Sequence, residues 1–228
     1  MRLVYDLPTR VFHWSFVLLF LTSILISKFV DSDSVVFNYH MLSGLLMLLI
    51  IILRFVWGIV GTRYAKFSGF DLRPKNLVSY MLGLLKSDHR KWPGHNPATS
   101  FAAITMIAIG FNLGVTGLLM TYGNQKERFE DIHELLSTAF IVLVISHLAG
   151  LIIHTIRHKE MIAVSMVSGE KKDIAVADSI PNSQRAVGFA FLAFILASAL
   201  YLAMNFSKET RTLNLFGTPI QLGKAEES

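Results

Sequence analysis

Four histidines stand inside or at the edges of long apolar stretches, where an imidazole has little water to hydrogen-bond. His133 and His147 are fourteen residues apart in one apolar run. On a helix they point to nearly the same side, about 40° apart, and are separated by roughly 21 Å along the axis. His13 and His40 stand at the ends of two other apolar runs. This spacing suits two stacked metal cofactors, because a bilayer core is about 30 Å thick and each buried histidine needs a partner.

The composition is that of an integral membrane protein. Of the 228 residues, 53% are hydrophobic and 16% are charged, and the mean hydropathy of +0.51 is too high for an ordinary soluble domain. The chain contains no cysteine, which excludes thiolate-bound iron–sulfur clusters, covalently attached c-type haem and disulfides. The net charge of +5 is spread over loops between the apolar runs, which argues against nucleic-acid binding.

Five apolar runs are long enough to span a membrane, and they cover residues 12–30, 35–60, 100–121, 132–156 and 186–205. None of the six prolines falls inside a run, which favours uninterrupted helices. We therefore expect an all-α fold in which a four-helix transmembrane bundle is followed by a fifth transmembrane helix. The expected parts are a core at 1–160 that includes a loop at 62–99, a connector at 161–185, a fifth span at 186–206 and a tail at 207–228.

The lysines and arginines predict the orientation in the membrane, because positively charged loops are retained in the cytoplasm. The segment 62–99 carries seven basic and two acidic side chains, a net charge of +5. The first outer loop carries Asp31 and Asp33, and the loop at 122–131 carries two basic and three acidic side chains. We therefore expect a multi-pass protein of the bacterial inner membrane. Its amino terminus would be cytoplasmic, and its two acidic loops and its tail would be periplasmic.

This orientation sorts the histidines into two pairs at matching depths. His13 and His147 lie toward the cytoplasm, whereas His40 and His133 lie toward the periplasm. Two imidazoles on opposite sides of an iron porphyrin make a six-coordinate haem b, which favours electron transfer over oxygen chemistry. The pairing predicts two haems b, one inner and one outer, each with two histidines on its iron. A zinc or copper path is the alternative, and it predicts acids or methionines beside the histidines.

Three further side chains are candidates for contact with a cofactor or a quinone. Arg54 would reach the level of the inner haem, fourteen residues after His40, and could pair with a propionate; the alternative is an arginine that extends to the lipid headgroups. Arg10, at the start of the first run, has the same two interpretations. His154 continues the histidine stripe of the fourth run. It could exchange protons with a quinone headgroup, or it could lie in interfacial water.

The glycines of the apolar runs also have two explanations. Gly110, Gly114 and Gly117 share one broad face of the third run, and Gly44 is one turn after His40. Each glycine could admit either a flat macrocycle or a neighbouring helix.

The cytoplasmic segments contain one further predicted element. Pro74 followed by Leu77, Tyr80 and Met81 predicts a short amphipathic helix on the membrane surface. His89, His95 and His158 fall in charged segments, and we expect them to be solvated.

Several segments, in order, resemble the bacterial cytochrome b561 family, which includes the b-type cytochrome subunits of nickel–iron hydrogenases. They are the stretch from Tyr5 to Trp14, the block from Arg54 to Phe67, the sequence Asp131-Ile132-His133-Glu134, and the stretch from His147 to Lys172. The resemblance implies a four-helix bundle with two haems b, whose axial ligands would be His13, His40, His133 and His147. It also implies electron exchange between the quinone pool and a partner at the membrane surface. The fifth helix and the tail from Asn205 to Ser228 depart from the shorter family pattern.

Together these features predict a di-haem cytochrome, either an electron-transfer subunit or a quinone-linked oxidoreductase. Electrons would pass between a cytoplasmic-side quinone and a periplasmic c-type cytochrome, reductase or hydrogenase. Quinol oxidation is the favoured direction, and hydrogenase input to quinone is the second. A superoxide:quinone oxidoreductase is an alternative, although acidic outer loops would repel an anion. A haem-containing membrane anchor and a metal-ion transporter are further alternatives, and the sequence leaves a homo-oligomer open.

Overall fold

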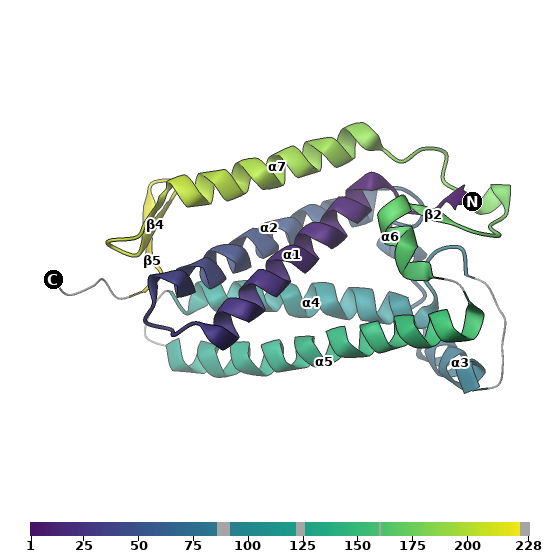
Figure 1. The fold of residues 1–228 in the computed structure, drawn as a ribbon, viewed down its shortest axis with the longest axis horizontal. Coiled ribbons are helices and arrows are strands. Elements are labelled where there is room, and N and C mark those ends of the chain that lie inside the picture. Colours follow the sequence, from purple (N-terminus) through teal and green to yellow (C-terminus); the bar gives the residue numbers. More distant parts are fainter. Residues whose placement is uncertain (86–91, 122–125, 160, 224–228) are drawn as a thin grey trace.

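The computed structural model describes residues 1–85, 92–121, 126–159 and 161–223. Within these residues, five helices are long and apolar enough to cross a membrane. They are α1 (Leu7–Phe29), α2 (Asn38–Val60), α4 (Pro97–Leu119), α5 (Lys126–His158) and α7 (Arg185–Met204). They correspond to the five predicted runs and confirm the all-α membrane fold. The helices run side by side, with α7 along one side of the assembly and α5 along the other (Figure 1).

Local sequence signals set the helix starts. The Asp6 side chain caps α1 by accepting a hydrogen bond of 2.9 Å from the Thr9 amide, and Asn96 caps α4 in the same way through Thr99 at 2.8 Å. A proline stands in the first turn of each helix, where its fixed φ suits a helix and its missing N–H costs nothing. The second span begins in the 3₁₀ helix η1 (Val35–Phe37).

The centre of the assembly is α2, which packs against α1, α4 and α7, while α5 packs mainly on α4. A Cβ placed on Gly114 would lie 2.8 Å from the Leu48 Cβ, and one on Gly110 would lie 3.1 Å from the Ile51 Cδ1. These two glycines therefore let α4 approach α2 closely. This favours the neighbouring helix over the macrocycle as the explanation for them. Gly117 faces the imidazole of His133, and Gly44 has no heavy atom within 4 Å of an added Cβ.

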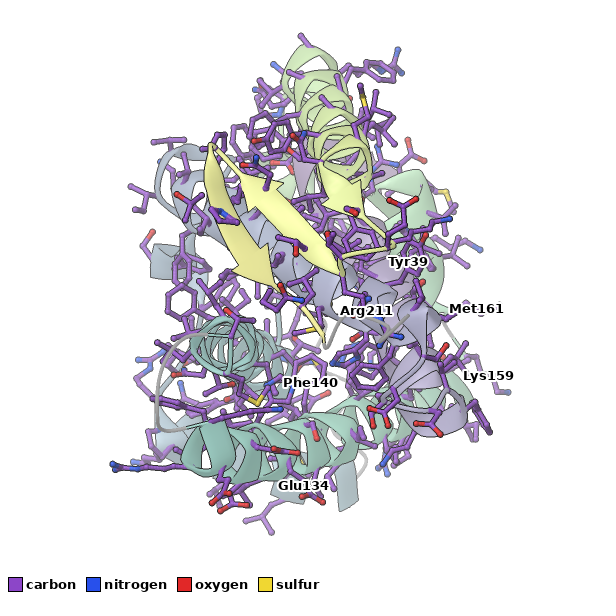
Figure 2. The ribbon with its side chains drawn as sticks, turned by 90° about the vertical axis from the view of Figure 1, so that its left-hand side faces the viewer. Tyr39, Glu134, Phe140, Lys159, Met161 and Arg211 are labelled. Carbon is purple, nitrogen blue, oxygen red and sulfur yellow. The ribbon has the colours of Figure 1, made fainter. Side chains whose placement is uncertain are left out.

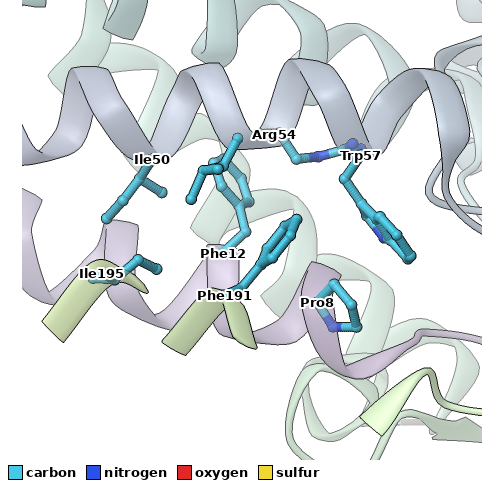
Figure 3. Close-up of a pocket in the computed structure, with 8 residues that line it drawn as sticks. Pro8, Phe12, Ile50, Arg54, Trp57, Phe191 and Ile195 are labelled. Atoms are coloured by element: carbon cyan, nitrogen blue, oxygen red, sulfur yellow. The ribbon is translucent and has the colours of Figure 1, made fainter. Parts of the chain in front are cut away.

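The fifth span lies outside the four-helix bundle. Figure 3 shows a narrow, mostly apolar crevice in which Phe191 and Ile195 of α7 face Phe12 of α1 and Ile50 of α2. Arg54 and Trp57 lie toward one end of it (Figure 3). The seam therefore joins α7 to the bundle by hydrophobic contact.

A small antiparallel sheet follows α7. Its strands are β3 (Phe206–Ser207), β4 (Thr212–Leu215) and β5 (Thr218–Gln221), in that order. Leu213 and Ile220 are buried against the helix core around Leu42 and Leu46. Figure 2 shows the sheet from its own end of the molecule, in front of the helices. Part of the predicted tail is therefore folded onto α2 and α7.

The opposite end of the molecule carries the amino terminus and most of the short elements outside the spans (Figure 1). Strand β1 (Arg2–Leu3) pairs with β2 (Glu170–Lys171). The predicted surface helix is present as α3 (Pro74–Leu85). The remaining elements are η2 (Phe67–Gly69), η3 (Ile162–Val164), α6 (Ser165–Ser168) and η4 (Val176–Asp178).

Candidate cofactor-binding site

His40 of α2 and His133 of α5 face each other across the bundle. Their ring centroids are 6.2 Å apart and their ring planes are inclined by 71°. Two metal–nitrogen bonds of about 2 Å each, together with the distance from each nitrogen to its ring centre, give a centroid separation of roughly 6 Å. The two imidazoles therefore have the separation that a shared metal ion between them requires.

The second nitrogen of each of these rings is held by a neighbouring helix. The Nδ1 of His40 lies 2.9 Å from the Ser23 carbonyl oxygen. That oxygen can only accept, so Nδ1 is the donor and carries the proton. The Thr116 hydroxyl donates to the Asn112 carbonyl at 2.9 Å and can accept from the Nδ1 of His133 at 3.0 Å. Nε2 of His40 is then the lone-pair nitrogen, and Nε2 of His133 is too when Thr116 accepts, which is how metal-binding histidines are oriented.

His13 of α1 and His147 of α5 form the second pair and lie near the amino-terminal end of the molecule. Each is partly buried, and they are close enough for electrostatic interaction. The Trp14 indole contacts His13 edge-on at 5.3 Å between ring centroids, and its Nε1 donates to the Met166 carbonyl at 2.8 Å. The α6 segment therefore covers α1 beside this histidine.

Phe140 lies midway between the two pairs, seven residues from His133 and seven from His147 on α5. It is 3% exposed and is the only fully buried side chain among those described on α5. Its ring packs against Phe16 and Phe20 of α1 at centroid distances of 6.0 and 5.3 Å. Figure 2 labels it between the helices. These phenylalanines lie between the His13–His147 pair and the His40–His133 pair.

Arg54 is buried, with 4% of its surface exposed, so the interpretation that it extends to the headgroups is wrong. Its guanidinium carbon lies 4.7 Å from the ring centre of Phe67 and 5.8 Å from that of Phe12. Nη2 donates to the Ala65 carbonyl at 2.8 Å. Within the described residues, the buried Nη1 has no hydrogen-bond partner. An anionic acceptor such as a carboxylate would satisfy it.

Asp6 connects the start of α1 to the block from Arg54 to Phe67 by hydrogen bonds. Its carboxylate is 1% exposed and accepts hydrogen bonds from the Trp57 Nε1 at 3.1 Å and the Thr62 hydroxyl at 2.6 Å. A Cβ on Gly58 would overlap the Phe67 ring. The glycine therefore allows Phe67 to lie against Arg54.

A family model described as prokaryotic cytochrome b561 matches residues 4–169, which is most of the chain. The chain belongs to the prokaryotic cytochrome b561 family. Two similar proteins are both named "Probable Ni/Fe-hydrogenase B-type cytochrome subunit". The one from Rhodobacter capsulatus is 23% identical over 210 residues, covering 74% of this chain and 80% of the relative. The one from Bradyrhizobium diazoefficiens is 24% identical over 210 residues, covering 74% and 85%. No solved structure matches the chain.

Membership of the cytochrome b561 family makes the chain a haem b electron-transfer protein of a membrane. The residues fit that cofactor in two respects: His40 and His133 have a metal-compatible separation, and Arg54 holds a buried donor that a propionate would satisfy. No group of three or more histidine, cysteine or acidic side chains in the described ranges has the arrangement of a metal-ion site.

The other residues that the sequence suggested for contact with a cofactor or a quinone lie at the amino-terminal end of this cytochrome. Arg10 donates from Nη1 to the Val167 carbonyl at 2.6 Å, so at least one of its nitrogens holds the α6 segment. His154 is partly buried on α5, beyond His147. His89 lies outside the described residues, as does the side chain of His158.

His95 corrects an expectation, because it is partly buried rather than solvated. Its ring packs against Phe70 at 4.7 Å and edge-on against Tyr5 at 5.6 Å. Burial, together with the positive charges of Lys171 and Arg54, lowers the pKa of His95 to about 3. The imidazole is therefore neutral at physiological pH.

Proposed function

We propose that this cytochrome b561 holds two haems b and moves electrons between a quinone at its amino-terminal face and a redox partner at the opposite face. His13 and His147 would ligate the iron nearer the amino terminus, and His40 and His133 would ligate the other. Haem b supplies a one-electron iron couple, and two axial histidines favour electron transfer. The protein's part is to hold and orient the ligands and to exclude water.

The observation that carries the proposal is the geometry of His40 and His133, with 6.2 Å between ring centroids and Nδ1 of each ring held by a neighbouring helix. The fourteen-residue interval between His133 and His147 supports a second site on the same face of α5. In this arrangement Arg54 would pair with a propionate of the haem nearer the amino terminus. We assign Arg10 a second, weaker interaction with the same cofactor.

The quinone is proposed to bind beside His154, because a titratable imidazole near the membrane surface can take up or release the protons that accompany quinone chemistry. The basic segment 62–99 favours a cytoplasmic location for this face and hence the bacterial inner membrane. The names of both relatives support a hydrogenase-type partner, which we place on the periplasmic side, opposite the quinone. The acidic residues of the two outer loops would also suit a basic c-type cytochrome.

The first experiment is a pyridine haemochrome assay with reduced-minus-oxidised spectra on the purified protein. We expect two haems b per chain, and we expect His13→Ala, His40→Ala, His133→Ala and His147→Ala each to lose about one haem. A single haem in the wild type would overturn the di-haem proposal. Titration with a quinol follows. Two bound haems that quinol cannot reduce would favour a membrane-anchor subunit in which haem is structural.

A further inference from the structure

The turn between β4 and β5 presents an aromatic side chain in an uncommon conformation. Leu215 pairs with Thr218, so Phe216 and Gly217 form a two-residue hairpin turn. Both have positive φ, +49° for Phe216 and +87° for Gly217. Turns of this kind favour asparagine or glycine, and a bulky residue in the left-handed region is strained. Phe216 is nevertheless 85% exposed, so no burial within the chain compensates for this strain.

Tyr201 of α7 holds Phe216 in this outward position. The two rings are stacked at 5.3 Å with 22° between their planes. The Phe216 amide also donates to the Tyr201 hydroxyl at 2.9 Å. Both the backbone and the ring of Phe216 are therefore fixed to the last turn of α7, and the side chain is presented in a defined place.

The surroundings of Phe216 are apolar on the helix and uncharged on the hairpin. Leu196, Leu200 and Met204 are exposed along one stripe of α7 that ends beside Tyr201. This stripe belongs to a helix that is long and apolar enough to cross a membrane, so we expect it to face lipid. Residues 212–221 carry no charged side chain, whereas Lys208, Glu209 and Arg211 lie in the turn at the other end of the sheet.

We infer that the β4–β5 turn is a membrane-interface anchor, in which Phe216 enters the headgroup region of the bilayer beside the end of α7. In this zone an apolar ring at the end of a span gains free energy by leaving water, while nearby polar groups stay hydrated. The hairpin packs on Leu42 and Leu46 of α2. Anchoring it therefore also fixes the end of the helix that carries His40. The inference does not depend on haem content or on the proposed electron transfer.

The absence of cysteine makes a direct test simple. We would place a nitroxide label on Phe216→Cys in the full chain in phosphatidylcholine nanodiscs, and measure its collisions with oxygen, which concentrates in lipid, and with a water-soluble nickel chelate. Leu200→Cys serves as the lipid reference and Lys208→Cys as the aqueous reference. Thr218→Cys is a second reporter of the same turn that leaves Phe216 in place.

We expect both turn labels to resemble Leu200→Cys, with more collisions with oxygen than with nickel. Labels that resemble Lys208→Cys would place the turn in water and overturn the inference. Labels shielded from both reagents would also overturn it, since they would indicate contact with another protein or a second copy of the chain. As a further check, Phe216→Ser should increase the mobility of the Thr218→Cys label; unchanged mobility would contradict an anchoring role.

Discussion

The hydroxyl of Thr116 and the carbonyl of Ser23 perform the same task for two different histidines. Each hydrogen-bonds with Nδ1 of an imidazole on another helix and holds the orientation of the ring. These contacts cross from α1 to α2 and from α4 to α5. The helix that carries a histidine therefore does not alone determine where its Nε2 points.

Thr116→Val tests this role at nearly constant side-chain volume. Removing the hydroxyl leaves the Nδ1 of His133 without its acceptor, and the loss of such a contact weakens metal-site affinity by roughly 10–100-fold. We expect haem loss from the His40–His133 site on dilution, measured from the Soret absorbance after gel filtration. The control is Thr22→Val, because the Thr22 hydroxyl donates to the Leu18 carbonyl within its own helix. Equal haem retention in the two variants would contradict the prediction.

The buried imidazole of His95 predicts a pH-dependent stability. Its pKa is about 3 in the folded chain, against about 6.5 in an unfolded one. Between these values the unfolded state binds a proton that the folded state does not, so stability is full above about pH 6.5 and falls as the pH drops toward 3. We expect the thermal midpoint to fall less steeply with acidification in His95→Phe than in the wild type. Identical slopes would contradict the prediction, because they would show that His95 binds protons equally in the folded and the unfolded state.

The candidate ligands could be derived from the sequence, whereas the residues that support them could not. Histidine in an apolar run is rare enough to attract attention, and the helical rise converts its position into depth. Ser23 and Thr116 are ordinary in membrane helices, and only the facing of neighbouring helices identifies them. Phe140 could have been found, because it lies at the midpoint of the interval from His133 to His147. The burial of His95 depends on contacts with Tyr5 and Phe70, which are distant in sequence.

At the scale of elements, the membrane spans followed from the sequence because hydropathy and proline placement act locally. The three short strands after α7 did not, since two to four residues give too weak an alternating pattern and their burial depends on Leu42 and Leu46 of α2. The glycines also required the structure. Gly110 and Gly114 proved to be packing positions, because helix facing and not glycine spacing distinguishes a neighbouring helix from a macrocycle.

Gly58→Ala tests the junction between α2 and η2. The added methyl group would overlap the Phe67 ring, which lies against the buried guanidinium of Arg54. Overpacking of this kind costs about 1–3 kcal/mol, so we expect a lower thermal midpoint. Gly150→Ala is the matched control, because an added Cβ there has no heavy atom within 4 Å and alanine favours a helix. A midpoint as high in Gly58→Ala as in the control would show that Phe67 moves aside freely.

Short elements cover both ends of the helical assembly. One combines the amino terminus, α3, α6 and the β1–β2 pair, and the other carries the three-stranded sheet (Figure 1). Positive charge concentrates at the first end. We assign that end to the cytoplasm from this asymmetry.

Single cysteines report this orientation. We expect a membrane-impermeant maleimide added to intact spheroplasts to label Lys208→Cys, at the sheet end, and to label Lys75→Cys, in α3, only after permeabilisation. Both positions are exposed in the structure. The opposite labelling pattern would invert the topology and with it the proposed location of the quinone.

Phe140 is the one fully buried side chain among those described on α5, and this has a consequence for biogenesis. This helix packs mainly on α4, and among its described side chains Phe140 alone is fully buried in the bundle. Its other contacts with the bundle would then come from the cofactors that its histidines are proposed to bind. If the histidines hold haem as proposed, α5 would dock firmly only in chains that have received their cofactors. We then expect cofactor-poor chains to expose this helix to membrane proteases and to be degraded before they join an electron-transfer complex.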